Sequence, residues 1–192
     1  MKLILASGSP RRLALLQKEG VEPIVRVPDV DETIDRPLSP TETVIELATR
    51  KARAAAKEGK PEEYILCADT IVACENEILG KPKNEKDAYR MLRLLSGSTH
   101  HVLTGHCIAH NNEFKWCYED TKITFRELTD DEINAYIDSG EPFGKAGAYA
   151  IQEKGDRFVK AMDGAWDNVV GLSINCVKKL LSQYEKNLED FI

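Results

Sequence analysis

The chain has 192 residues, of which 42% are hydrophobic and 30% are charged, and its formal net charge at pH 7 is −6. This length suffices for one large domain or two small lobes with a real core, and the acidic balance argues against a main role in binding nucleic acid or anionic membranes. No apolar run approaches the roughly 18 residues that a membrane-spanning helix needs, and the short apolar start, broken at Gly8, predicts no signal peptide.

The first stretch predicts a strand, a loop of small residues and a helix. The apolar run at residues 3–6 is typical of a buried strand, and the Ser-Pro pair that follows the loop is favoured at the start of a helix. Two arginines stand in the first turn, where the partial positive charge of the helix N-terminus disfavours a cation by about 0.3–1 kcal/mol each. A bound anion would reverse that sign, so the stretch predicts a phosphate cradle, with a solvated basic turn as the alternative. The cradle would consist of Ser7, Gly8, Ser9, Arg11 and Arg12.

A second strand is predicted over residues 21–27, followed by an acidic loop over residues 28–33. The loop is either a solvated connector or a segment that turns Asp31 or Glu32 toward a metal or a basic pocket.

A capping box at Ser39 and Glu42 predicts a helix that ends near residue 57. Lys51 lies within the apolar stripe of this helix. A lysine on a packed face either extends to water or binds an anion, so Lys51 is a candidate ligand for a carboxylate or a phosphate.

The run over residues 64–73 predicts a buried strand with Asp69 in its middle. An isolated carboxylate there is costly, so Asp69 must be paired, metal-bound or at a cleft. We favour a cleft, where the rigid strand would hold a catalytic carboxylate, and a structural ion pair with Lys51 is the alternative. Further along, a glycine and a proline fix the backbone around Lys81, which favours a placed cation.

The second half of the chain mixes helices with a hairpin. Helices are predicted over residues 84–95, 129–140 and 173–184, and strands over residues 99–109, 114–125 and 158–162. A loop of small residues around Lys145 is either a long connection or a place where backbone approaches a ligand closely. The tail after Lys186 is predicted to fray. Alternating strands and helices followed by a hairpin favour an α/β fold with a mixed sheet.

Cysteines and histidines do not suggest a metal centre. The five cysteines are odd in number and never spaced as CxxC, which predicts reduced thiols in a cytoplasmic protein. The histidines at positions 100, 101, 106 and 110 alternate poorly and lack a carboxylate at ligand spacing. We therefore expect them on the strand surface or in the core.

Taken together, the motifs resemble the Maf family of nucleoside triphosphate pyrophosphatases along nearly the whole chain. The matching segments are ASGSPRR (6–12), ADT (68–70), LGKP (79–82), LSGSTHHVLTG (95–105), SGEPFGKAGAYAIQ (139–152) and NVVGL (168–172). Within the family, Thr70 after Asp69 and Gln152 after the glycine-rich loop resemble the branch that hydrolyses dTTP and UTP.

The resemblance implies a single domain over residues 1–192 with a fold like that of the inosine triphosphatase superfamily. Such a fold has a curved mixed sheet flanked by helices and two lobes around a deep cleft. It also implies a divalent cation, magnesium or manganese, a nucleoside triphosphate substrate and a homodimer.

The proposed chemistry assigns a role to each candidate residue. Asp69 would accept a proton from the attacking water and share the metal with Glu32. The cradle residues and three lysines would hold the triphosphate, and the resemblance places three residues where substrate choice is made. The lysines are Lys51, Lys81 and Lys145, and the specificity residues are Arg12, Thr70 and Gln152.

Two alternatives accompany this hypothesis. The Maf name is linked to arrest of septum formation, so the chain could inhibit cell division by binding a partner, with hydrolysis secondary. It could also remove modified pyrimidine nucleotides, because one methyl group is worth only about 1–3 kcal/mol of selectivity.

Overall fold

Seven strands form one mixed sheet in the computed structural model, which describes residues 1–192. Their order is β2-β1-β3-β5-β6-β7, and β4 pairs with β3 off this path. β1 is parallel to β2 and β3, whereas β4 is antiparallel to β3 and β7 to β6. The strands are β1 (Lys2–Leu5), β2 (Ile24–Val25), β3 (Glu63–Cys74), β4 (Glu77–Leu79), β5 (Thr99–His110), β6 (Glu113–Phe125) and β7 (Val159–Asp163). The predicted mixed α/β fold is confirmed.

The helices start where the sequence places capping residues. They are α1 (Pro10–Lys18), α2 (Pro40–Ala56), α3 (Glu85–Leu95), α4 (Asp130–Asp138), α5 (Trp166–Val170) and α6 (Ile174–Ser182), with short 3-10 helices η1 (Ala146–Ala148), η2 (Lys154–Phe158) and η3 (Leu188–Phe191). Every α-helix except α5 has an N-cap side chain that accepts a backbone hydrogen bond. The capping boxes predicted at the starts of α2 and α4 are both confirmed. None of the helices is long and apolar enough to cross a membrane.

The chain divides into two compact units. The first contains residues 1–69, 104–119 and 171–192, and the second contains residues 70–103 and 120–170.

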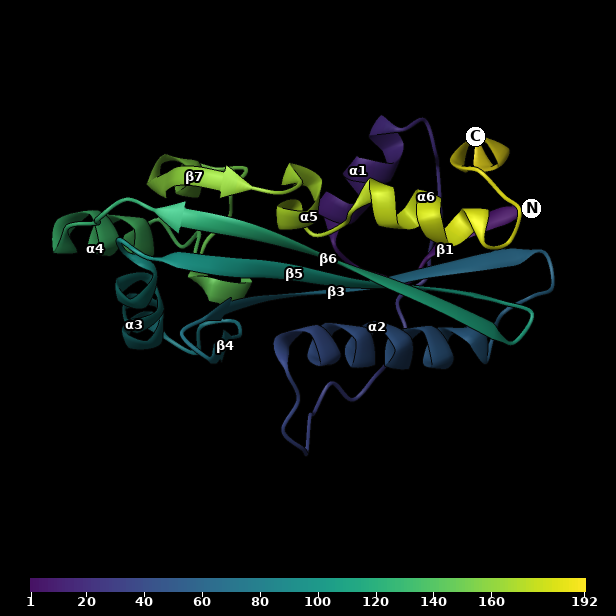
Figure 1. The fold of residues 1–192 in the computed structure, drawn as a ribbon, viewed down its shortest axis with the longest axis horizontal. Coiled ribbons are helices and arrows are strands. Elements are labelled where there is room, and N and C mark those ends of the chain that lie inside the picture. Colours follow the sequence, from purple (N-terminus) through teal and green to yellow (C-terminus); the bar gives the residue numbers. More distant parts are fainter. The chain divides into compact units, whose positions relative to one another are not determined.

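In the first unit, α2 and α6 lie on opposite faces of β5. Cys107 belongs to a core cluster with Ala48 and Ala52 of α2, whereas the preceding His106 accepts a hydrogen bond from Ser173 at the start of α6. Successive side chains of a strand point to opposite faces of its sheet. The two helices therefore cover the two sides of this part of the sheet, as Figure 1 shows.

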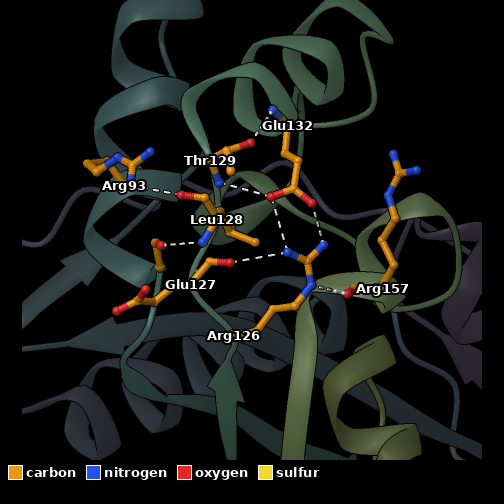
Figure 2. A network of polar contacts seen from close by, with 8 residues as sticks. Arg93, Arg126, Glu127, Leu128, Thr129, Glu132 and Arg157 are labelled. Carbon is orange, nitrogen blue, oxygen red and sulfur yellow. Dashed lines mark hydrogen bonds and ion pairs between the residues drawn. The ribbon is translucent and has the colours of Figure 1, made fainter.

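In the second unit, a polar network joins the end of β6 to the start of α4 (Figure 2). The Arg126 guanidinium donates to both carboxylate oxygens of Glu132, at 2.7 and 3.1 Å, and its Nε donates to the Arg157 carbonyl at 3.1 Å. Arg93 of α3 donates to the Leu128 carbonyl at 3.0 Å. A bidentate arginine–carboxylate pair fixes orientation as well as distance. The network therefore fixes the position of the start of α4 relative to α3 and the end of β6.

Two strand predictions need correction. The strand predicted over residues 21–27 was too long, because only the two residues of β2 pair with β1. Pro23 has no N–H to donate to the ladder, which limits pairing on that side. β4 was missed: Glu75 and Asn76 both have positive φ, 49° and 68°, and form the turn that folds β4 back onto β3.

The prediction that the tail after Lys186 frays was wrong. Leu188 of η3 is buried, and the Phe191 ring packs edge-on against Tyr64 with their centroids 5.3 Å apart. The burial of Leu188 and the packing of Phe191 hold the C-terminal segment against the rest of the first unit. The short helix α5 was also missed, because its five residues are too few to show a helical period.

Candidate functional site

Lys51, Asp69 and Glu32 form a charged cluster in the first unit. Asp69 follows Ile65 and Cys67 of β3 at intervals of two, and both belong to the core cluster shared with α2. Because side chains two apart on a strand share a face, Asp69 faces α2 and meets Lys51. The Lys51 Nζ atom lies 2.5 Å from Asp69 Oδ1 and 3.0 Å from Glu32 Oε1. The Lys51 and Asp69 side chains are 14% and 11% exposed, whereas that of Glu32 is 57% exposed.

The ion pair between Lys51 and Asp69, which was the alternative to the favoured cleft position, is therefore present, and the cleft position stays a prediction. The ion pair does not exclude a chemical role, because one edge of the cluster opens to solvent through Glu32. The buried pair fixes the position of the carboxylate, and the exposed partner gives water and ions access to its surroundings.

The charges around Asp69 set its basicity. Burial raises the pKa of the Asp69 carboxyl above its ordinary value, and the nearby Glu32 carboxylate adds to the rise. The Lys51 ammonium and the Arg12 guanidinium act in the opposite direction. Desolvation outweighs them, so Asp69 binds a proton more readily than a surface aspartate does. A positioned carboxylate with a raised pKa is suited to act as a general base.

Arg12 is held in place from two sides. Its Nε donates to the Gly171 carbonyl at 2.7 Å, and a terminal nitrogen donates to Ser7 Oγ at 3.0 Å. Ser7 Oγ also accepts from the Ser9 backbone N–H at 3.2 Å, which shapes the loop before α1. Burial lowers the pKa of the Arg12 guanidinium, which carries a positive charge all the same because a free arginine titrates above about pH 12. The strand, loop, helix and Arg12 of this stretch thus lie together as predicted, and their binding of a phosphate stays a prediction.

The two carboxylates fit a hard divalent cation. Glu32 and Asp69 both pair with the Lys51 ammonium, so their carboxylates lie close to each other, and a cation held by both would lie beside that ammonium. No group of three or more His, Cys, Asp or Glu side chains could hold a metal by itself. A magnesium-type ion commonly takes one or two carboxylates and completes its shell with water and substrate phosphates. Such a shared shell matches this donor set.

The other predicted site residues lie in the second unit, where two of their motifs touch. The Gly147 N–H donates to the Gly80 carbonyl at 3.1 Å, which brings the turn before Lys81 against the loop that contains Lys145. Lys81 and Gln152 are exposed and Thr70 is half-buried. That these four residues act with the cluster of the first unit stays a prediction.

One residue that organises this loop was not identified from the sequence. Glu141 is buried, and its carboxylate accepts hydrogen bonds from the Tyr136 hydroxyl at 2.9 Å and from the Gly155 N–H at 3.2 Å. Its backbone carbonyl accepts from Lys145 Nζ at 2.7 Å. Glu141 precedes a proline in a turn-like sequence, where a solvated acid is the ordinary expectation, so only its partners reveal its role.

Gly171 is the second functional position that was missed. Its φ of 129° lies in the region that favours glycine, and its carbonyl orients Arg12. The available signal was the glycine of NVVGL placed just before a helix cap, but its partner lies 159 residues away.

Comparison with known proteins identifies the family of the chain. The family model described as Maf-like protein matches residues 2–184. A dTTP/UTP pyrophosphatase of Bacillus cereus is 49% identical over 183 residues, which cover 95% of both chains. A dTTP/UTP pyrophosphatase of Bacillus anthracis is 48% identical over the same length and coverage. Among solved structures, a nucleoside-triphosphatase / dITP/XTP pyrophosphatase from Mycobacterium abscessus is 15% identical, with a TM-score of 0.44 over 73% of this chain and 95% of that chain.

Proposed function

Since the chain belongs to the Maf family, we propose that it is a nucleoside triphosphate pyrophosphatase that hydrolyses dTTP and UTP. Relatives of nearly equal length and about half-identical sequence have that activity in their names. The observation on this chain that carries the proposal is the buried Asp69 carboxylate, held by Lys51 and flanked by Glu32 and Arg12.

The reaction is attack of water on the α-phosphorus. The bond from that phosphorus to the bridging oxygen breaks, and the products are the nucleoside monophosphate and pyrophosphate. Asp69 accepts the proton of the attacking water, and its raised pKa brings its basicity closer to that needed near neutral pH. Lys51 keeps the carboxylate oriented and offsets part of its charge.

Cationic side chains bind the triphosphate and neutralise its charge. Phosphoryl chemistry depends chiefly on such positioning and charge neutralisation. Arg11 and Arg12, with the backbone amides of residues 7–9, bind the triphosphate at the start of α1. Lys81 and Lys145 add positive charge. A divalent cation, magnesium or manganese, would be held by Asp69 and Glu32 and would neutralise phosphate charge when bound.

Substrate choice depends on groups that can pair with a pyrimidine edge. We assign it to Arg12, Thr70 and Gln152, of which Thr70 and Gln152 can hydrogen-bond a uracil or thymine edge. Buried polar groups left unpaired by a wrong base are costly enough to discriminate between substrates. The proposal also includes one catalytic domain and a homodimer, as the family resemblance implies, and a location in the cytoplasm, as the cysteine pattern predicts.

The test is release of pyrophosphate from a panel of nucleoside triphosphates, canonical and pyrimidine-modified, with magnesium, with manganese or with a chelator. We expect rapid release from dTTP and UTP, at least about tenfold slower release from purine substrates, and loss of activity with the chelator. Absence of release from every substrate would refute the proposal, and release of orthophosphate alone would assign a different bond. Faster turnover of a methylated pyrimidine would identify modified nucleotides as the preferred substrates.

A further inference from the structure

His106 of β5 is buried, and its ring accepts a hydrogen bond from the start of α6. Its Nε2 accepts a hydrogen bond from the Ser173 backbone N–H at 2.9 Å. A ring nitrogen that accepts carries no proton, so the neutral ring has its proton on Nδ1. Burial, with a further contribution from Arg12, lowers the pKa of His106 to about 3. The ring is therefore a permanent acceptor at neutral pH.

Both the backbone N–H and the hydroxyl of Ser173 are hydrogen-bonded. Its hydroxyl donates to Glu119 Oε2 at 2.5 Å and accepts from the Cys176 N–H at 3.1 Å, as the N-cap of α6. With the bond to His106, the beginning of the helix cannot shift without breaking several buried hydrogen bonds.

The segment from Gly171 to Ser173 connects this fixed point to Arg12. The Gly171 carbonyl accepts from Arg12 Nε at 2.7 Å, and it belongs to a glycine with a φ of 129°. The backbone at glycine is less restricted than at any other residue. The direction of the Gly171 carbonyl therefore depends on the contacts of the neighbouring residues. Leu172 is fully buried, and Ser173 supplies the next restraint along the chain.

We propose that His106 is a positioning residue for Arg12: by holding Ser173 it fixes the Gly171 carbonyl that orients the guanidinium. The inference rests on the proposed function, in which Arg12 binds the triphosphate. His106 itself does not touch the substrate. Its loss should weaken substrate binding by Arg12 while leaving the Asp69 chemistry intact, so that KM rises more than kcat falls.

The experiment compares two substitutions of His106 and repeats one of them in an Arg12→Ala background. His106→Leu removes the acceptor at similar volume, whereas His106→Gln can place an amide oxygen near the position of Nε2. We expect His106→Leu to lower kcat/KM for dTTP about tenfold, chiefly through KM, and His106→Gln to lower it less than about threefold. In an Arg12→Ala background, His106→Leu should cause no further loss, because coupled residues are not additive.

A matched control comes from the same strand. His110 also bonds to backbone, with Nδ1 and the Glu63 carbonyl 2.9 Å apart, and stacks on Tyr64. His110→Leu therefore deletes a similar group whose contacts are unrelated to Arg12, and kcat/KM should stay within about twofold of wild type.

Several results would overturn the inference. They are a loss in His106→Leu that persists with Arg12→Ala, an equal loss in His106→Gln, or no loss at all. Two spectroscopic measurements do not depend on turnover. The nitrogen spectrum of the wild type must show the Nδ1–H tautomer of His106, and the Arg12 Nε–H signal must move in His106→Leu. A protonated Nε2 or an unmoved arginine signal would refute the positioning role, even if the protein had no pyrophosphatase activity. Failure of the proposed function would instead be seen in the assay of the wild type.

Discussion

Single residues decide the chemistry, and Asp69 is the one on which the proposed reaction depends. Asp69→Asn keeps the size of the side chain but removes the proton acceptor, so we expect kcat for dTTP to fall by about 10²–10⁴. In the wild type, kcat should decline as pH falls through the raised pKa of Asp69, because only the ionised carboxylate accepts a proton. Steady-state rates across a pH series would measure both effects.

The control for this prediction is Asp31→Asn. Asp31 is an exposed neighbour of Glu32 whose carboxylate accepts from the Thr33 N–H at 2.9 Å, and the proposal gives it no role in the reaction. Near-normal turnover in Asp69→Asn, with the fold intact, would remove Asp69 from the role of base.

The sequence predicted individual site residues where a charged side chain interrupts an apolar pattern. Lys51 was identified because a cation interrupts an apolar stripe, and Asp69 because a carboxylate interrupts a buried strand. Each anomaly predicted the kind of partner it needed, and they proved to be each other's partner. The support of Arg12 could not be predicted in this way, because a backbone carbonyl such as that of Gly171 has no signature in the sequence.

Among the elements, the approach of α2 to β5 depends on Gly105. A Cβ atom at this position would lie 2.2 Å from the Val44 carbonyl oxygen of α2, and neither backbone can yield easily. We expect Gly105→Ala to destabilise the protein by about 3 kcal/mol, at the upper end of ordinary overpacking. Because α2 also carries Lys51, the same change should displace the partner of Asp69.

Gly80→Ala is the matched control, because a Cβ added there meets nothing within 4 Å. Urea unfolding of both variants and the wild type would measure the difference. Equal stability of Gly105→Ala and wild type would mean that α2 can move away from β5 at little cost.

Helices and strands differ in how well the sequence predicts them. Helix starts depend on one to four adjacent residues, as at Ser39 and Thr129, and were located correctly. Strand extent depends on a partner strand that is remote in sequence, so β2 was overestimated and β4 was missed. The buried tail at Leu188 depends on a surface made by other segments, which no local pattern encodes.

For the molecule as a whole, the pKa shifts predict how stability depends on pH. Burial lowers the pKa of His100 and of His106 to about 3, against about 6.5 in an unfolded chain. Between these values the unfolded state binds more protons, so stability falls as pH falls. Hydrogen bonding to arginines lowers the pKa of Glu63 and Glu132 to about 2, which acts in the same direction but only below about pH 4.3. The raised pKa of Asp69 has the opposite sign and offsets part of the loss.

Between about pH 6 and pH 5 the two buried histidines therefore dominate the slope, because the glutamates still remain ionised in both states. Each contributes up to about 1.4 kcal/mol of lost stability per pH unit. His100→Gln, which can keep a hydrogen bond to the Tyr149 hydroxyl now 2.7 Å from the ring, should lower the slope measured by urea unfolding at about pH 7, 6 and 5 by up to about 1.4 kcal/mol per pH unit. An unchanged slope in His100→Gln would show that His100 becomes protonated within the folded protein, and its burial would then not be the cause of the acid sensitivity.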